Sequence, residues 1–163
     1  MSHASVKLLL QDVAKSLADS MQFGYGRRSE FNMITNHKYP YIWLLPLTAA
    51  RRFVPNSTTH TKTWNVAIIF LDLDKADADE KQSEKILDSM DVLVDRYTQT
   101  LDDWFERSYD TMGAITIQND LQQPFYKDDS GVHTGWLLTF QLVVPDDFTY
   151  CTPENVDLYA GNI

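Results

Sequence analysis

The chain has 163 residues, of which 44% are apolar and 12% aromatic, and it carries a net charge of −9. This length provides for one hydrophobic core, so we expect a single domain over residues 1–163, with its core in 1–145 and an irregular, acidic tail over 146–163. The apolar runs are too short to cross a bilayer, which argues against a membrane partner. The single cysteine excludes a disulfide framework and a multi-cysteine zinc site.

Charge is distributed unevenly along the chain. Residues 1–62 carry eight Lys and Arg against three Asp and Glu, whereas residues 63–163 carry six against twenty. If the two parts also separate in space, the molecule has a basic side and an acidic side that attract each other between copies. Head-to-tail contacts of this kind close into rings or continue as fibres. If folding mixes the two parts, the asymmetry disappears.

The first half of the chain predicts one helix and two strands. Apolar residues recur every three or four positions over 4–21, which predicts a helix, and we expect the glycines of Gly24-Tyr25-Gly26 to form the turn after it. A short strand is predicted at Glu30–Ile34. The apolar run Tyr41–Thr48 predicts another, which should lie at an edge or carry a bulge because Pro46 cannot donate a ladder hydrogen bond.

Residues 51–62 contain the polar stretch PNSTTHT, which predicts an exposed loop or the tip of a long hairpin. The strand predicted next, Thr63–Leu73, has apolar residues on both faces. Both faces should therefore be covered, and the strand should lie centrally in the sheet. Its second cover could be the first helix or a neighbouring subunit.

The second half predicts a long helix over 77–108 and strands over 114–119 and 134–144, with Pro124 in the connection between these two strands. Strands that follow one another through turns favour antiparallel pairing. The predicted fold class is therefore α+β: a mostly antiparallel sheet of four to five strands, with an N-terminal helix and one long helix packed on it.

Asp72, Asp74 and Asp77 follow the central strand and are the chain's main candidate for metal chemistry. Carboxylate oxygens suit Mg²⁺ and Ca²⁺, so one hypothesis is a metal-dependent phosphodiester or phosphate enzyme. The spacing does not match an EF-hand loop, however, and acidic residues also favour the first turn of a helix, where Asp77 would be the N-cap. We interpret the group as a helix start and expect no metal, cofactor-binding or catalytic residues.

Histidines and arginines give weaker signals. His3, His37, His60 and His133 are far apart and lack any metal-ligand spacing, so we expect each to be solvated or bonded locally in an exposed or turn-like segment. The pairs Arg27-Arg28 and Arg51-Arg52 lie near aromatic residues, as in nucleic-acid surfaces. The same aromatics could equally be strand core residues, and a pI near 4.7 disfavours close approach to DNA.

Two stretches and the order of elements resemble a known class of proteins. The stretches are IQNDLQQPFYKDDSGVHTGWLLTFQLVVPDDFTYC (117–151) and NHKYPYIWLLPL (36–47). Together with the order helix, strands, polar hairpin, long helix and paired strands, they resemble the tail terminator, tail completion and head-to-tail connector proteins of tailed bacteriophages. The residues of these stretches are similar to those of connector proteins of phages that infect Bacteroidetes, including the crAss-like group.

The resemblance implies a non-enzymatic structural protein of the virion, assembled in the host cytoplasm. Such a protein forms a head-to-tail ring, contacts neighbouring connector or tail rings, and lets DNA pass through its channel without sequence-specific binding. Our candidates for contacts between subunits or for the channel lining are Arg51, Arg52, Asn56, Ser57, Thr58, Thr59, His60, Asp91, Asp95 and Asp102. An adaptor domain is the remaining alternative, beside the metal-dependent enzyme.

We predict that arginines of the basic part contact acidic residues of the long helix in the next subunit. The double substitution Arg51→Glu and Arg52→Glu should therefore weaken assembly, and assembly of the unmodified chain should weaken as salt screens the charges. Sedimentation velocity across a salt series measures both effects. Oligomers that respond neither to the substitutions nor to salt would show that these charges do not hold subunits together.

Overall fold

The computed structural model describes residues 2–17, 21–31, 38–52, 61–74, 80–108, 115–127 and 132–145. Its elements are α1 (His3–Leu17), β1 (Gln22–Tyr25), α2 (Arg28–Phe31), β2 (Tyr41–Leu44), β3 (Thr48–Arg52), β4 (Thr61–Leu73), α3 (Glu80–Ser108), β5 (Thr116–Phe125) and β6 (His133–Pro145). In this part of the chain six strands form one sheet in the order β1-β2-β4-β6-β5, with β3 also paired to β4. The predicted α+β class is confirmed, with six strands rather than four to five.

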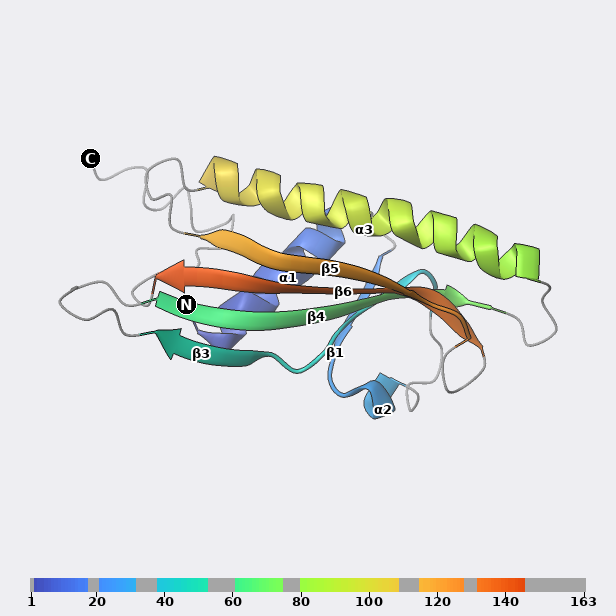
Figure 1. Ribbon diagram of the computed structural model, residues 1–163, viewed down its shortest axis with the longest axis horizontal. Helices are drawn as coiled ribbons and strands as arrows, with labels where there is room; N and C mark the ends of the chain where they lie inside the picture. Colours follow the sequence, from blue (N-terminus) through green and yellow to red (C-terminus); the bar gives the residue numbers. More distant parts are fainter. Residues whose placement is uncertain are drawn as a thin grey trace.

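β4 is the central strand, as predicted. It pairs antiparallel with β6 along its whole length, from Thr61 opposite Pro145 to Leu73 opposite His133. Its other edge is shared by β2 and β3, both antiparallel to it, while β1 joins β2 in parallel. Figure 1 shows β4 and β6 running the length of the sheet, with α3 along one side and α2 on the other.

Pro46 divides the strand that was predicted over Tyr41–Thr48. β2 ends at Leu44, Leu45 N still donates to Ala67 O at 2.9 Å, and pairing resumes at Thr48 opposite Asn65. Proline has no N–H to donate, so the ladder is interrupted where the sequence indicated. β3 and β4 form the predicted hairpin, and its tip, 53–60, lies outside the described residues.

The strand predicted at Glu30–Ile34 is wrong where it can be compared, because Glu30 and Phe31 belong to α2. The Glu30 carboxylate accepts a hydrogen bond from Arg27 N at 2.9 Å, a capping contact that favours a helical turn. The turn predicted at Gly24 is also wrong, since Gly24 lies inside β1 opposite Trp43. A Cβ there would overlap the Trp43 indole, so the position requires glycine for space.

Pro124 lies within β5 and not in the connection where it was predicted. β5 is the last strand of the sheet and pairs only with β6 among the described elements. A missing N–H is tolerated at such an edge because no further strand needs it.

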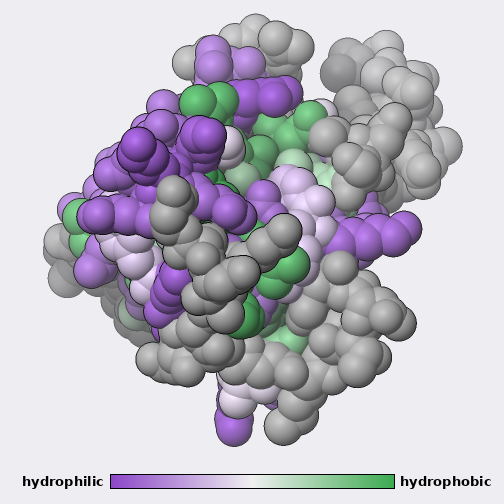
Figure 2. Space-filling view, turned by 90° about the vertical axis from the view of Figure 1, so that its right-hand side faces the viewer, coloured by the Kyte–Doolittle hydropathy of each residue, from purple (hydrophilic) through white to green (hydrophobic). Residues whose placement is uncertain are grey.

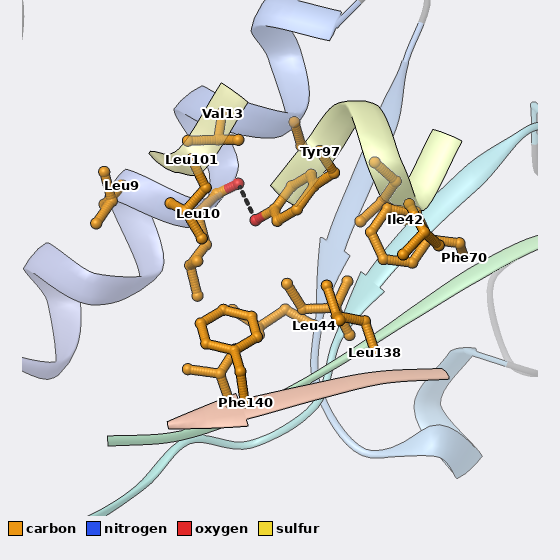
Figure 3. Packing of buried hydrophobic residues seen from close by; sticks show 14 of the residues in the cluster. Leu9, Leu10, Val13, Ile42, Leu44, Phe70, Tyr97, Leu101, Leu138 and Phe140 are labelled. Carbon is orange, nitrogen blue, oxygen red and sulfur yellow. Dashed lines mark hydrogen bonds between the residues drawn. The ribbon is translucent and has the colours of Figure 1, made fainter. Parts of the chain in front are cut away.

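Both α1 and α3 pack on one face of the sheet, which we call the helix-covered face. Tyr97 of α3 is fully buried between them, and its hydroxyl donates to the carbonyl of Leu10 at 3.0 Å (Figure 3). Burial raises the pKa of this hydroxyl, so it stays protonated and donates. The Tyr97 ring also meets Phe70 of β4 edge to face, at 5.3 Å between centroids. The first helix therefore does not supply the second cover of β4.

Gly135 is a position where the sheet leaves no space for a side chain. It lies opposite Leu71, and a Cβ would overlap the carbonyl oxygen of Phe70. Overpacking costs about 1–3 kcal/mol or more, so Gly135→Ala should lower the free energy of unfolding by at least about 1 kcal/mol. Urea denaturation measures it, with Thr139→Val on the same strand expected to stay within about 0.5 kcal/mol. Equal urea midpoints for Gly135→Ala and the unmodified chain would contradict the close contact between Gly135 and the Phe70 carbonyl.

Candidate functional site

The face of the sheet opposite α1 and α3, which we call the second face, is covered at one end by α2. There the buried residues are Phe31, Tyr41, Trp43, Ile69 and Leu71. The Phe31 ring meets both Tyr41 and Trp43 edge to face, each at 5.3 Å between centroids. The Trp43 indole N–H donates to Gly26 O at 3.0 Å, which holds α2 to the sheet. The second cover of β4 at this end is therefore α2.

The other half of the second face carries a row of hydrogen-bonded side chains, the amide row: Asn119, Gln141, Asn65 and Thr48. Asn119 Nδ2 donates to Gln141 Oε1 at 2.8 Å, and Gln141 Nε2 donates to Asn65 Oδ1 at 3.1 Å. Asn65 Nδ2 then donates to Thr48 Oγ1 at 3.1 Å. The row crosses four strands, from β5 through β6 and β4 to β3.

The amide row borders an open hollow of about 340 Å³. The second-face side chains that line it with the row are Pro46, Ala67 and Thr139. Beside it Leu121 is 60% exposed, after a bulge in β5 between Gln118 and Leu121. Asn119 sits in this bulge with a φ of 54°, a conformation that asparagine tolerates better than most residues. The described side chains that line this open half of the second face are uncharged and mostly polar, with a few apolar ones, and exposed Asp120 lies in the bulge beside them.

An apolar recess of about 240 Å³ lies between α2 and β5. Its apolar lining is Leu45, Ile69, Pro124, Phe125 and Leu137. The Arg28 guanidinium lies 5.9 Å from the centre of the Phe125 ring at its border. Arg27, Arg28 and Lys38 are exposed at this end and outnumber the exposed carboxylate of Glu30, so this end of the second face is basic on balance.

α3 carries carboxylates along its solvent side, which we call the acidic stripe: Glu84, Asp88, Asp91, Asp95 and Asp102. Their spacing of three, four or seven residues places them in one row. All are exposed except Asp91, which is half-buried, and Val92 beside them is 59% exposed. α3 and α2 lie on opposite sides of the sheet (Figure 1). The acidic helix and the basic residues Arg27, Arg28 and Lys38 around α2 are therefore separated in space, although α1, with Lys7 and Lys15, lies on the α3 side.

The structure places the remaining predicted contact residues as follows. Arg51 and Arg52 end β3, opposite Lys62 and Thr61 of β4. Asn56, Ser57, Thr58, Thr59 and His60 lie outside the described residues. Seen from the end where α3 begins, the described surface is mainly hydrophilic, with apolar side chains in small patches between the hydrophilic ones (Figure 2).

Asp74, a candidate metal ligand, is fully buried and ties three elements together. Its Oδ2 accepts from Ser83 Oγ at 2.5 Å and from Thr134 Oγ at 2.7 Å, and its N–H donates to Val132 O at 2.7 Å. These bonds join the end of β4 to the first turn of α3 and the start of β6. No described residue donates to Oδ1.

Asp72 does not join Asp74 in a larger ligand group. It is half-buried, accepts from Leu73 N at 2.7 Å, and has its pKa raised by burial. Asp77 lies outside the described residues. Within the ranges given above, no group of three or more His, Cys, Asp and Glu is arranged to hold a metal ion.

His133 was predicted to lie in a turn-like segment and instead opens β6, almost fully buried. Its Nε2 shares a hydrogen bond with the Tyr39 hydroxyl at 2.8 Å, and its ring meets Phe31 edge to face at 5.3 Å. This histidine belongs to the packing of the second face. Sequence reasoning missed it because Tyr39 is 94 residues away.

Comparisons of the chain with protein-family models and with curated protein sequences found no match. Among the helices of the described ranges, none combines the length and the apolar character needed to cross a membrane. The surfaces described above are the open half of the second face, the basic end of the second face beside α2, and the acidic stripe.

Removing the Asp74 carboxylate should destabilise the fold. Asp74→Ala leaves the buried hydroxyls of Ser83 and Thr134 without their acceptor, and two charge-assisted hydrogen bonds are lost. The free energy of unfolding should fall by about 3 kcal/mol, measured by urea denaturation. Asp88→Ala on the exposed side of α3 is the control and should change it by less than about 0.5 kcal/mol. A decrease in the free energy of unfolding no larger than that of Asp88→Ala would show that the Asp74 hydrogen bonds to Ser83 and Thr134 do not stabilise the fold.

Asp72 should make stability depend on pH. Because burial raises its pKa in the folded state, the folded chain holds the proton more tightly than the unfolded chain. The stabilisation of the folded state that comes from this tighter proton binding is therefore complete below the unfolded pKa of about 3.9, and it is lost as pH rises through the folded pKa. Asp72→Asn should be at least as stable as the unmodified chain at pH 7, with an advantage that shrinks towards pH 4. Urea denaturation from pH 7 to pH 4 measures the difference in the free energy of unfolding between Asp72→Asn and the unmodified chain. A difference in favour of Asp72→Asn that grows as pH falls would contradict the raised pKa of Asp72.

Proposed function

We propose that this chain is a structural subunit that assembles head to tail with its own copies into a ring, at the head-tail connector or the tail end of a tailed phage. DNA passes through the channel of this ring without sequence-specific binding, and the subunit performs no catalysis. The observation that carries the proposal is the second face of the sheet, which the chain's own described residues cover over only part of its length.

The open half of this face suits contact with another protein surface. Small side chains such as Ala67 and Thr139 allow a second copy to approach closely, and the amide row offers donors and acceptors already held in place. Neutral amides can be desolvated at lower cost than charges when they find partners. This favours a protein neighbour over a charged ligand at this face.

The occupant we propose is α3 of the next copy. Its acidic stripe, with exposed Val92 among the carboxylates, would face the basic end of the second face at Arg27 and Lys38. The two surfaces lie on opposite sides of one sheet, so each copy offers both at once. Such a contact uses different patches on the two partners, and repeating it gives a ring where the rotation between copies closes and a fibre where it does not. We propose the ring.

The order of the elements supports the phage assignment. Apart from the short α2, which the expected order lacked, the described helix, strands, β3–β4 hairpin, long α3 and paired β5 and β6 follow the order on which the resemblance to tail terminator and connector proteins rests.

Charge reversal and charge exchange test the contact. Asp88→Lys with Asp95→Lys should shift assemblies towards monomers, because the new lysines then face Arg27 and Lys38, and adding Arg27→Glu with Lys38→Glu should restore them. Sedimentation velocity and negative-stain microscopy report the size and the ring, with Lys15→Glu on α1 as a charge-reversal control. Assembly that is unchanged by the Asp88 and Asp95 substitutions, or no rescue by the exchange, would contradict the proposed contact.

A further inference from the structure

Basic and aromatic side chains from three elements meet on the helix-covered side of the sheet, near the start of α1. They form what we call the basic-aromatic cluster: His3 and Lys7 of α1, Tyr25 of β1, and Lys62 and Trp64 of β4. His3 Nε2 shares a hydrogen bond with the Tyr25 hydroxyl at 2.9 Å. The His3 ring lies 5.6 Å from the Tyr25 ring and 6.1 Å from the Trp64 ring, between centroids.

Both lysines of the cluster are held over aromatic rings. Lys7 Nζ lies 4.7 Å from the centre of the Tyr25 ring, and Lys62 Nζ lies 4.2 Å from the centre of the Trp64 ring. A ring quadrupole positions an ammonium group but does not cancel its charge. No carboxylate of the described residues pairs with either lysine, although the whole chain has 23 Asp and Glu.

The start of α1 adds to the positive potential. α1 begins at His3, its first turn has no acidic residue, and Ser2 Oγ caps it by accepting from Ser5 N at 3.1 Å. The partial positive charge at this helix end therefore lacks an acidic partner in its own first turn. Trp64 is only 4% exposed and gives the cluster a rigid base, whereas Lys7 and Lys62 are half-buried and His3 is exposed.

We infer that the basic-aromatic cluster binds a phosphate group. Two ammonium groups and an imidazole offer several donors to a compact, highly charged anion, and such charge-assisted bonds are the strong ones. The ring faces below the ammonium groups are occupied, so a base cannot stack on them and recognition acts through the phosphate. The phosphate can belong to a nucleic-acid backbone or be free in solution. The site is built within one chain and does not depend on ring assembly.

The test compares two pairs of substitutions in the full chain. Lys7→Gln with Lys62→Gln removes the site charges, and Lys15→Gln with Lys81→Gln removes two exposed lysines elsewhere. Sodium phosphate is titrated against sodium chloride of equal ionic strength, with the NMR shifts of the His3 ring and of the Lys7 and Lys62 amides as readout. A labelled DNA duplex of about 20 base pairs, long enough to contact many phosphates, is titrated by fluorescence anisotropy.

We expect phosphate, and not chloride, to shift these signals, and the site pair to weaken phosphate binding about tenfold while the control pair changes it less than about twofold. If the duplex also binds and the site pair lowers its salt slope by about 2, the phosphate is that of nucleic acid. Phosphate binding without duplex binding assigns a free anion.

Equal effects of the two pairs, or equal shifts with phosphate and chloride, would overturn the inference. It would also be overturned if the site pair weakened only assembly, because the cluster would then face the acidic stripe of another copy. The proposed ring is tested independently of this site, by whether the unmodified chain assembles.

Discussion

The antiparallel pairing of β4 with β6 is the constraint on which the rest of the structure depends. Thirteen residues of each strand are in register, so every side chain of the two strands is assigned to one face or the other. A slip by one residue would turn Leu138, Phe140 and Leu142 away from the core. Two contacts hold this register: Gly135 lies directly against the backbone at Phe70, and the buried carboxylate of Asp74 bonds Thr134 and Ser83 at the strand end.

The same pairing explains the length of α3. A 29-residue helix extends about 44 Å, and a 13-residue strand extends about 43 Å, so α3 can cover the helix-covered face from end to end. α1 crosses beside it and joins the same core through the Tyr97 hydroxyl and the carbonyl of Leu10. With both longer helices on one face, α2 is the one described helix on the other face, and the described residues leave the amide row open.

The molecule therefore presents different chemistry in different directions. The acidic stripe lies on the solvent side of α3, and the amide row and the basic residues Arg27 and Lys38 lie across the sheet. Two lysines without carboxylate partners among the described residues lie over aromatic rings near the start of α1. Two complementary surfaces on opposite sides of a molecule suit head-to-tail assembly, because a copy that uses one surface in a contact keeps its other surface free for the next copy. The basic-aromatic cluster does not depend on these surfaces, since His3, Lys7 and Lys62 are linked through the Tyr25 and Trp64 rings of one chain.

The sequence by itself determined the elements whose signal is local: the long helix, the central strand with two apolar faces, the hairpin, and the interruption at Pro46. Periodicity and the missing proline N–H act within a few residues, so they can be read without the fold. Only the tertiary structure decided that α1 lies beside α3, that Phe31 belongs to a helical turn packed on the second face, and that Asp74 is buried. The bond between Asp74 and Thr134 joins residues 60 apart, and that between Gln141 and Asn65 joins residues 76 apart. Contacts over such separations follow from strand register and topology, which no local pattern encodes.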